Sequence, residues 1–278
     1  MEGSSRSECP AMAQQGEESI PPPGCAEADP PGGWAPCPYL PDRASRLVGQ
    51  QLAPELTLLP SAYDRLLSLN HRRSGRLIYR PQCPGCQACR SLRVPTATFL
   101  PSRSQRRVLR RNTDVKVEIR PPRPTRESYT LYERYLAHQH DGRMSDGPEA
   151  FVAFLYDSPT DTVEIQYRVG SDLVAVSLAD RIPSGLSSVY VFFDPRHARR
   201  SPGTFTALWE IEHCRQAGLA YYYLGYYVAG SAKMTYKAAF RPCEILDAEG
   251  AWRSFDAAVA PLAGLRPAAP SQDQPSRA

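Results

Sequence analysis

The chain has 278 residues, of which 42% are hydrophobic and 22% charged, and its formal net charge is +4. This length and apolar content allow a buried core, so we expect a globular protein with two modest domains. The longest apolar run, Val189 to Phe193, is far shorter than the roughly 20 residues of a membrane helix, so no membrane partner is expected. The N-terminus carries no secretion signal, and we therefore expect a cytoplasmic protein whose eight cysteines are reduced thiols or metal ligands.

Both ends of the chain have compositions typical of disorder. Residues 1–35 are rich in Pro, Gly, Ser and Glu, and residues 257–278 in Ala, Pro, Ser and Gln. Such segments bury too little apolar surface to offset the entropy lost on ordering. We expect the ordered part to comprise a smaller N-terminal cysteine-cluster and basic domain, residues 36–111, followed by a second domain, residues 112–256.

Three cysteines, Cys83, Cys86 and Cys89, fall within one short segment. Thiolates at this spacing can bind one zinc ion or one iron-sulfur cluster. Cys37, at the start of the ordered region, is a candidate fourth ligand. Unliganded thiols remain the alternative, because a four-ligand site requires Cys37 to fold back from a distant part of the sequence.

Basic residues are concentrated between Arg72 and Arg126, where fifteen arginines and lysines accompany only two acids, Asp114 and Glu118. Guanidinium groups bind phosphate, so this segment favours contact with nucleic acid, with a solvated surface as the alternative. The densest cluster has the spacing of one helical face and consists of Arg103, Arg106, Arg107, Arg110 and Arg111.

The periodicity of the following residues predicts alternating helices and strands. Strands are expected at residues 115–119, 162–169, 173–178, 186–193, 221–226 and 244–246, and helices from Thr125 and at 148–155, 204–217 and 231–240. Turn residues at 170–172 and 183–185 predict antiparallel hairpins between the strands that they join.

This order, β-α-α-β-β-β-α-β-α-β, is the element order of the GNAT-type N-acetyltransferase fold. It implies an α+β (α/β) domain with a mixed, mainly antiparallel sheet and flanking helices, in which an acyl donor lies where two central strands splay apart. Acetyltransferases hold coenzyme A with a loop that corresponds to Arg200 to Thr204. Phe205 stands where that loop has a small residue, so we expect no coenzyme A here.

Lysine is rare in this chain. Only Lys116, Lys233 and Lys237 occur, and the other 30 of the 33 basic residues are arginine. Lys233 and Lys237 lie four residues apart, which suggests positions that need a compact ammonium with an adjustable pKa. Two ordinary surface lysines are the alternative, and at least half of the tyrosines at 221–223, 226 and 227 are expected to be core residues.

A series of short motifs runs from Cys37 to Leu246. They are Cys37-x-Tyr-Leu-Pro-x-Arg43, Leu77-Ile-Tyr-Arg-Pro81 with the three cysteines, Ser104-Gln-Arg-Arg107, Phe192-Phe-Asp-Pro195, Tyr223-Leu-Gly-Tyr-Tyr227, Lys233-Met-x-Tyr-Lys237 and Phe240-Arg-Pro242. Together they resemble the aminoacyl-tRNA protein transferases, most closely the bacterial aspartate/glutamate leucyltransferases of the N-degron pathway, which are related to the eukaryotic arginyltransferases. The chain departs from the family pattern at Pro202, usually aliphatic, and at Ser231, often cysteine.

The resemblance implies transfer of leucine from leucyl-tRNA to proteins with N-terminal Asp or Glu, with aminoacyl-tRNA as co-substrate. It implies that Tyr236 protonates the leaving hydroxyl, that Lys237 or Lys233 holds the acidic side chain or the terminal phosphate, and that a bulge within residues 190–194 supplies an oxyanion donor. Substrate or tRNA binding is further expected at Arg43, Arg80, Asp194 and Tyr226. The alternatives are an arginine donor with the same acceptors, a coenzyme-A-dependent acyltransferase, and a non-enzymatic nucleic-acid adaptor.

Overall fold

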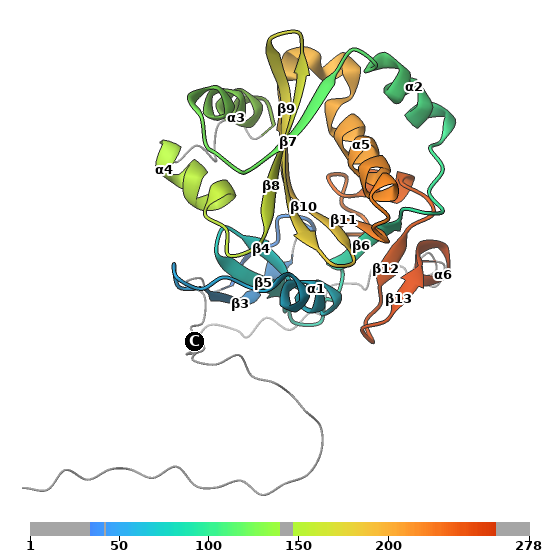
Figure 1. The fold of residues 1–278 in the computed structure, drawn as a ribbon. Coiled ribbons are helices and arrows are strands. Elements are labelled where there is room, and N and C mark those ends of the chain that lie inside the picture. The colour runs from blue at the N-terminus through green and yellow to red at the C-terminus, as the bar shows by residue number, and fades with distance from the viewer. Residues whose placement is uncertain (1–33, 42, 140–146, 260–278) are drawn as a thin grey trace, which may run out of the picture.

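The computed structural model describes residues 34–41, 43–139 and 147–259. These residues form an eight-stranded sheet with helices packed against it (Figure 1). The strand order is β13-β12-β6-β11-β10-β9-β8-β7, and among the described strands only β10 and β11 pair in parallel. The strands are β6 (Arg90–Pro95), β7 (Lys116–Arg120), β8 (Thr162–Val169), β9 (Asp172–Ile182), β10 (Gly185–Phe193), β11 (Tyr221–Tyr227), β12 (Glu244–Leu246) and β13 (Trp252–Ser254). The expected mixed, mainly antiparallel α+β fold is confirmed.

Helices cover both faces of this sheet (Figure 1). One face carries α3 (Arg126–Gln139), α4 (Gly147–Phe151) and the π-helical turn η1 (Val152–Tyr156), and the other carries α5 (Pro202–Gln216) and α2 (Arg103–Arg111), while α6 (Phe255–Val259) follows β13. Leu136 and Phe192 are fully buried in the core under α3, and Ile165 and Ile211 in the core under α5. The sheet is therefore shielded from water on both faces.

A smaller sheet lies at the lower end of the molecule in Figure 1. Its strand order is β3-β5-β4, with β3 (Leu47–Gln51), β5 (Leu77–Pro81), β4 (Arg72–Ser74) and the helix α1 (Pro60–Ser68) beside it. Two further short strands, β1 (Ala35–Pro36) and β2 (Ala44–Ser45), pair with each other. Arg73 on β4 joins the small sheet to the large one, because its guanidinium donates to both carboxylate oxygens of Asp180 on β9 at 2.7 and 2.8 Å.

The N-terminal segment contributes directly to the large sheet. β6 lies between β11 and β12, where Leu92 and Val94 are fully buried, and α2 packs against α5. The sheet thus takes strands from both sides of residue 111, and the proposed division there remains a prediction. The disorder predicted for residues 1–35 and 257–278 falls almost entirely outside the described residues. No helix in the described part of the chain has the length and apolarity needed to span a bilayer.

Most of the predicted helices and strands form near their expected positions, but the helix expected at 231–240 is wrong, and the strands before residue 103 and β13 were not predicted. Only a 3-10 helix, η3 (Thr235–Ala239), forms there. Lys237 in η3 and Phe240 just after it are both buried, and their three-residue spacing matches the 3-10 period. Pro242 follows and cannot continue a helix. The segment therefore forms a short 3-10 helix that directs these two side chains into the core, and no amphipathic α-helix forms.

Candidate active site

The two central strands β10 and β11 pair over only a short length. Their register joins Gly185–Ser187 to Tyr221–Tyr223 and ends there. β10 has a bulge between Ser188 and Tyr190, and β11 has one between Tyr223 and Gly225. A bulge bends its strand and takes a residue out of the ladder, so the strands separate beyond this point. The sequence predicts this bulge within residues 190–194, and it lies slightly earlier, between Ser188 and Tyr190.

Lys237 is buried at this end of the paired region, with 7% of its surface exposed. Its ammonium Nζ donates to the backbone carbonyl of Tyr226 at 2.7 Å. Burial and the nearby charge of Arg72 lower the pKa of Lys237 from 10.5 to about 7. Lys233, in contrast, is exposed, so the two lysines occupy different environments.

A second buried cation, Arg72 on β4, was not singled out in the sequence analysis. Its guanidinium donates to the Ser187 hydroxyl at 3.1 Å and to the Ser188 carbonyl at the bulge of β10. A Cβ placed on Gly225 would lie 3.4 Å from Nζ of Lys237 and 3.5 Å from Nη2 of Arg72. Gly225 has a φ of +84°, which glycine adopts without strain. Two cations from distant segments thus converge above this glycine.

Tyr236 precedes Lys237 but points the other way. Its side chain is 53% exposed. Although much of the residue is exposed, partial loss of water around its hydroxyl and the neighbouring Tyr135 of α3 raise the pKa of Tyr236, so the hydroxyl keeps its proton at neutral pH. Tyr226 is instead buried, and its hydroxyl donates to the carbonyl of Asn70 at 2.8 Å, which attaches β11 to the segment before β4.

Of the other residues expected to bind substrate, Asp194 already has partners and Arg43 and Arg80 are exposed. Asp194 is 1% exposed, forms ion pairs with Arg134 and Arg196 at 2.7 Å each, and caps the 3-10 helix η2 (Pro195–Arg200). Arg43 and Arg80 are exposed on the N-terminal part of the chain. Their roles in binding remain predictions.

The four candidate metal ligands occupy one neighbourhood. Burial, followed by the proximity of Cys37, Cys83 and Cys86, raises the pKa of Cys89 to about 12. The Cys83 thiol is turned toward Arg46, where its sulfur accepts from the backbone N–H at 3.4 Å. Within the described ranges, no three or more His, Cys, Asp or Glu side chains lie close enough to hold a metal. As they lie, the thiols do not form a closed metal site, and their binding of zinc or an iron-sulfur cluster remains a prediction.

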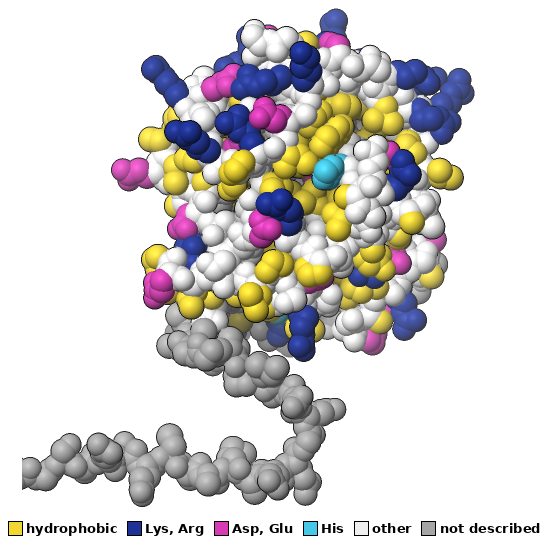
Figure 2. Space-filling model, viewed as in Figure 1, with side chains coloured by type: hydrophobic (Ala, Val, Ile, Leu, Met, Phe, Trp, Pro, Cys, Tyr) yellow, Lys and Arg dark blue, Asp and Glu magenta, His cyan; other side chains and the backbone are white. Residues whose placement is uncertain are grey.

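The basic cluster forms the helix α2, with the bounds that its spacing indicates. Ser102 and Gln105 form a capping box at its start. Its five arginines, at 103, 106, 107, 110 and 111, are all exposed, and basic side chains gather over α2 at the upper right of Figure 2. The amide of Gln105 donates to the carbonyl of Ala239 at 3.1 Å, so α2 begins beside η3. The basic helix therefore adjoins the segment that carries Tyr236 and Lys237.

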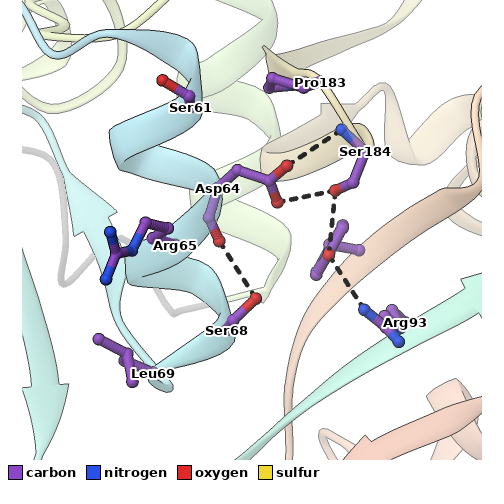
Figure 3. A pocket seen from close by; sticks show the side chains of 9 residues that line it. Ser61, Asp64, Arg65, Ser68, Leu69, Arg93, Pro183 and Ser184 are labelled. Carbon is purple, nitrogen blue, oxygen red and sulfur yellow. Dashed lines mark hydrogen bonds between the residues drawn. The ribbon is translucent and has the colours of Figure 1, made fainter.

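A hollow of about 460 Å³ lies elsewhere, between α1 and the start of β10 (Figure 3). The Asp64 carboxylate at its wall accepts from the backbone N–H and the hydroxyl of Ser184 at 3.0 and 2.7 Å, and that hydroxyl lies 3.2 Å from the Tyr223 hydroxyl. These groups satisfy one another. None of the predicted site residues lines this hollow, and we treat it as structural.

The family of the chain follows from comparison with known proteins. Models for the C-terminal and N-terminal parts of arginine-tRNA-protein transferases match residues 127–247 and 35–107. The chain is 45% identical to an aspartate/glutamate leucyltransferase of Gluconobacter oxydans (strain 621H) over 82% of this chain and 94% of that protein. The chain belongs to the aspartate/glutamate leucyltransferase family. A second family member, from Stenotrophomonas maltophilia (strain K279a), is 44% identical over 81% of this chain and 91% of its own length.

Solved structures with similar folds are more distant. FemX is 8% identical with a TM-score of 0.44, covering 70% of this chain and 68% of its own. The C-terminal domain of a putative lysylphosphatidylglycerol synthetase from Agrobacterium fabrum is 16% identical with a TM-score of 0.44 and 64% coverage of both chains.

Proposed function

We propose that this protein transfers leucine from leucyl-tRNA to the α-amine of N-terminal Asp or Glu, which gives the acceptor an N-terminal leucine as a signal for proteolysis in the cytoplasm. The observation that carries the proposal is the placement of Lys237. A buried cation at the separation of β10 and β11, beside an exposed arginine helix, suits an acidic acceptor and an RNA-borne acyl group.

The reaction is attack of the amine nitrogen on the ester carbonyl carbon of leucyl-tRNA. A C–N bond forms, the C–O bond to the terminal ribose breaks, and the amine loses a proton. An α-amine has a pKa of about 7.7 to 8.0, so a useful fraction is already neutral and no strong base is needed. Catalysis then depends on positioning, on stabilising the oxyanion and on protonating the departing ribose oxygen.

Two groups of this chain suit the protonation of the ribose oxygen and the stabilisation of the oxyanion. Tyr236 is exposed beside Lys237 and protonated at neutral pH, so its hydroxyl can donate the proton that the ribose oxygen takes up. The bulge of β10 between Ser188 and Tyr190 takes a backbone N–H out of the ladder, and such a group is a ready donor to an oxyanion. We assign the leaving-group acid to Tyr236 and the oxyanion donor to this bulge.

The tRNA is held, in this proposal, by the exposed arginines of α2. Phosphate contacts from Arg107 and Arg110 supply affinity without reading sequence. Because Gln105 joins α2 to η3, an RNA strand on this helix approaches the segment that carries Tyr236. The charged end of the tRNA is thereby directed toward the separated strands.

Coenzyme A is disfavoured as the acyl carrier by the turn before α5. Arg200 is engaged by the Asp114 carboxylate at 2.7 and 2.9 Å, and Pro202 offers no backbone N–H to a phosphate. Phe205 is buried in the core beside Tyr167. The donors that would hold a pyrophosphate are thus occupied or missing, which supports aminoacyl-tRNA as the co-substrate.

A transfer assay tests the function. The protein is incubated with a mixture of all charged tRNAs and an Asp-initiated peptide, and the mass added to the peptide is measured. Addition of one leucine residue is expected. Addition of an arginine residue would identify the arginyl alternative, and modification only when acetyl-coenzyme A replaces the charged tRNAs would overturn the proposal.

A further inference from the structure

Three neighbouring arginines are buried, but their partners differ. Arg73 binds the Asp180 carboxylate through two hydrogen bonds, and Arg76 contacts Asp157 at 3.2 Å. Arg72 has no carboxylate partner within the described part of the chain, and its guanidinium donates hydrogen bonds to the Ser187 hydroxyl and the Ser188 carbonyl. Burying a charge without a counter-ion is costly. Arg72 is therefore the buried arginine of this group that lacks an anion.

Lys237 is a second buried cation that lacks a counter-ion among the described residues. Its ammonium carries three donor hydrogens, and one of them serves the Tyr226 carbonyl. No carboxylate of the described residues pairs with it either. Because Arg72 and Lys237 both reach the space above Gly225, their charges repel each other. An anion bound between them would relieve that repulsion and use the remaining donors.

Among the described residues, the tyrosines beside the two cations carry no compensating negative charge. Tyr79 and Tyr226 lie edge to face beside the cations, with ring centroids 6.4 Å apart, and burial raises the pKa of both hydroxyls, so both are neutral at physiological pH. The site therefore keeps a positive charge beside uncharged tyrosine hydroxyls.

We propose that Arg72 and Lys237 together bind the side-chain carboxylate of the N-terminal Asp or Glu of the acceptor. This inference rests on the proposed function and adds Arg72 as a residue that determines acceptor specificity. Arg72 is bonded directly to the Ser188 carbonyl, so a carboxylate held there sets the acceptor backbone beside the bulge of β10. The attacking amine, two or three carbons from that carboxylate, then lies where we place the oxyanion donor.

A tRNA phosphate is the other anion that two cations can bind. Arg72 and Lys237 are each only 7% exposed, which suits a slender carboxylate on a flexible side chain better than a phosphate flanked by two riboses. The exposed arginines of α2 suit the RNA backbone instead. If the anion is the acceptor carboxylate, replacing either cation changes the choice among acceptor peptides. If the anion is a tRNA phosphate, the same replacement weakens the binding of tRNA.

The test measures kcat/KM for leucine transfer to four peptides that differ only in an N-terminal Asp, Glu, Asn or Gln. The variants are Arg72→Gln, which keeps donors for Ser187 and Ser188 but removes the charge, and Lys237→Met. Arg181→Met is the control, because Arg181 is an exposed arginine paired with Asp161. Melting temperature and affinity for leucyl-tRNA are measured for every variant, so that a folding defect is recognised.

We expect the unmodified enzyme to prefer Asp over Asn, and each variant to lower the rate with Asp and Glu peptides by about 30-fold or more. Rates with the Asn and Gln peptides, and tRNA affinity, should change little, and the double variant should lose little more than either single one. An unchanged Asp-to-Asn ratio in folded variants would overturn the inference. Equal losses of rate with all four peptides, accompanied by weaker tRNA binding, would also overturn it, because they indicate that the two cations bind a tRNA phosphate. Failure of the unmodified enzyme to leucylate any peptide would instead contradict the proposed function.

Discussion

The ammonium of Lys237 destabilises the free protein. Its pKa falls to about 7 in the folded chain, whereas an unfolded lysine has a pKa of about 10.4. Below about pH 7 both states are protonated, and the folded state bears the full cost of the buried charge. Between these pKa values the unfolded state binds more protons, so stability rises with pH. A residue kept at such a cost points to a role in function, not in folding.

Replacing Lys237 with Met should therefore stabilise the fold at pH 6 more than at pH 9. From the shift in pKa, the gain in free energy of unfolding should be about 2 to 3 kcal/mol larger at the lower pH. Urea unfolding at both pH values measures it. Lys116→Met, which removes an exposed lysine, serves as control and should show no such dependence. Equal gains at the two pH values would show that Lys237 is not a buried charge.

At the scale of elements, the helix α2 is anchored to the protein at its two ends and exposes its charged side chains between them. Its first turn is fixed by the capping box and by the bond from Gln105 to Ala239. Its last turn is held by Arg111, which donates to the carbonyl of Arg199. The arginines between these anchors stay exposed, so the helix is a rigid platform for charge. Rigid placement lowers the entropy lost when phosphate is bound.

Replacing Arg106, Arg107 and Arg110 together with Gln should weaken binding of all tRNAs similarly. Each lost phosphate contact should reduce the slope of log affinity against log salt by about 0.9, because fewer counterions are released. A triple replacement of Arg181, Arg215 and Arg253, all exposed and paired with carboxylates, is the charge-matched control. Salt titrations of both proteins provide the measurement. If the α2 variant keeps the unmodified slope, RNA does not bind on this helix.

For the whole molecule, the contact between Arg73 and Asp180 decides how the small sheet sits on the large one. Both side chains are fully buried, and Thr162 also donates to the carboxylate at 2.6 Å. Adjacent residues of a strand point to opposite faces, so fixing Arg73 also sets the direction of Arg72. The site at the separated strands thus depends on a contact outside it.

Arg73→Met should lower the free energy of unfolding by about 3 to 5 kcal/mol, because it leaves the Asp180 carboxylate buried and unpaired. The double variant Arg73→Met, Asp180→Leu should recover much of that loss, since it removes the stranded charge as well. Urea unfolding of the three proteins tests both statements. A double variant as unstable as the single one would mean that the loss has another source.

Local signals in the sequence determined much of the fold. The alternation and turns around residues 162–169 and 244–246 predicted β8 and β12 with their observed bounds, and the spacing of the arginines gave α2. The ordered motifs from Cys37 to Leu246 indicated the family. These features depend on neighbours in the chain, which a single sequence displays directly.

Burial and partnership were decided only by tertiary structure. Lys233 and Lys237 look alike in sequence, yet one is exposed and the other is buried at the separated strands, because η3 tightens into a 3-10 helix. Arg72 and Arg73 are adjacent, yet only Arg73 meets a carboxylate, 107 residues away in the chain. Which cation finds an anion depends on strand register across two sheets. This long-range pairing places Arg72 and Lys237 at one space. No sequence pattern local to either residue predicts it.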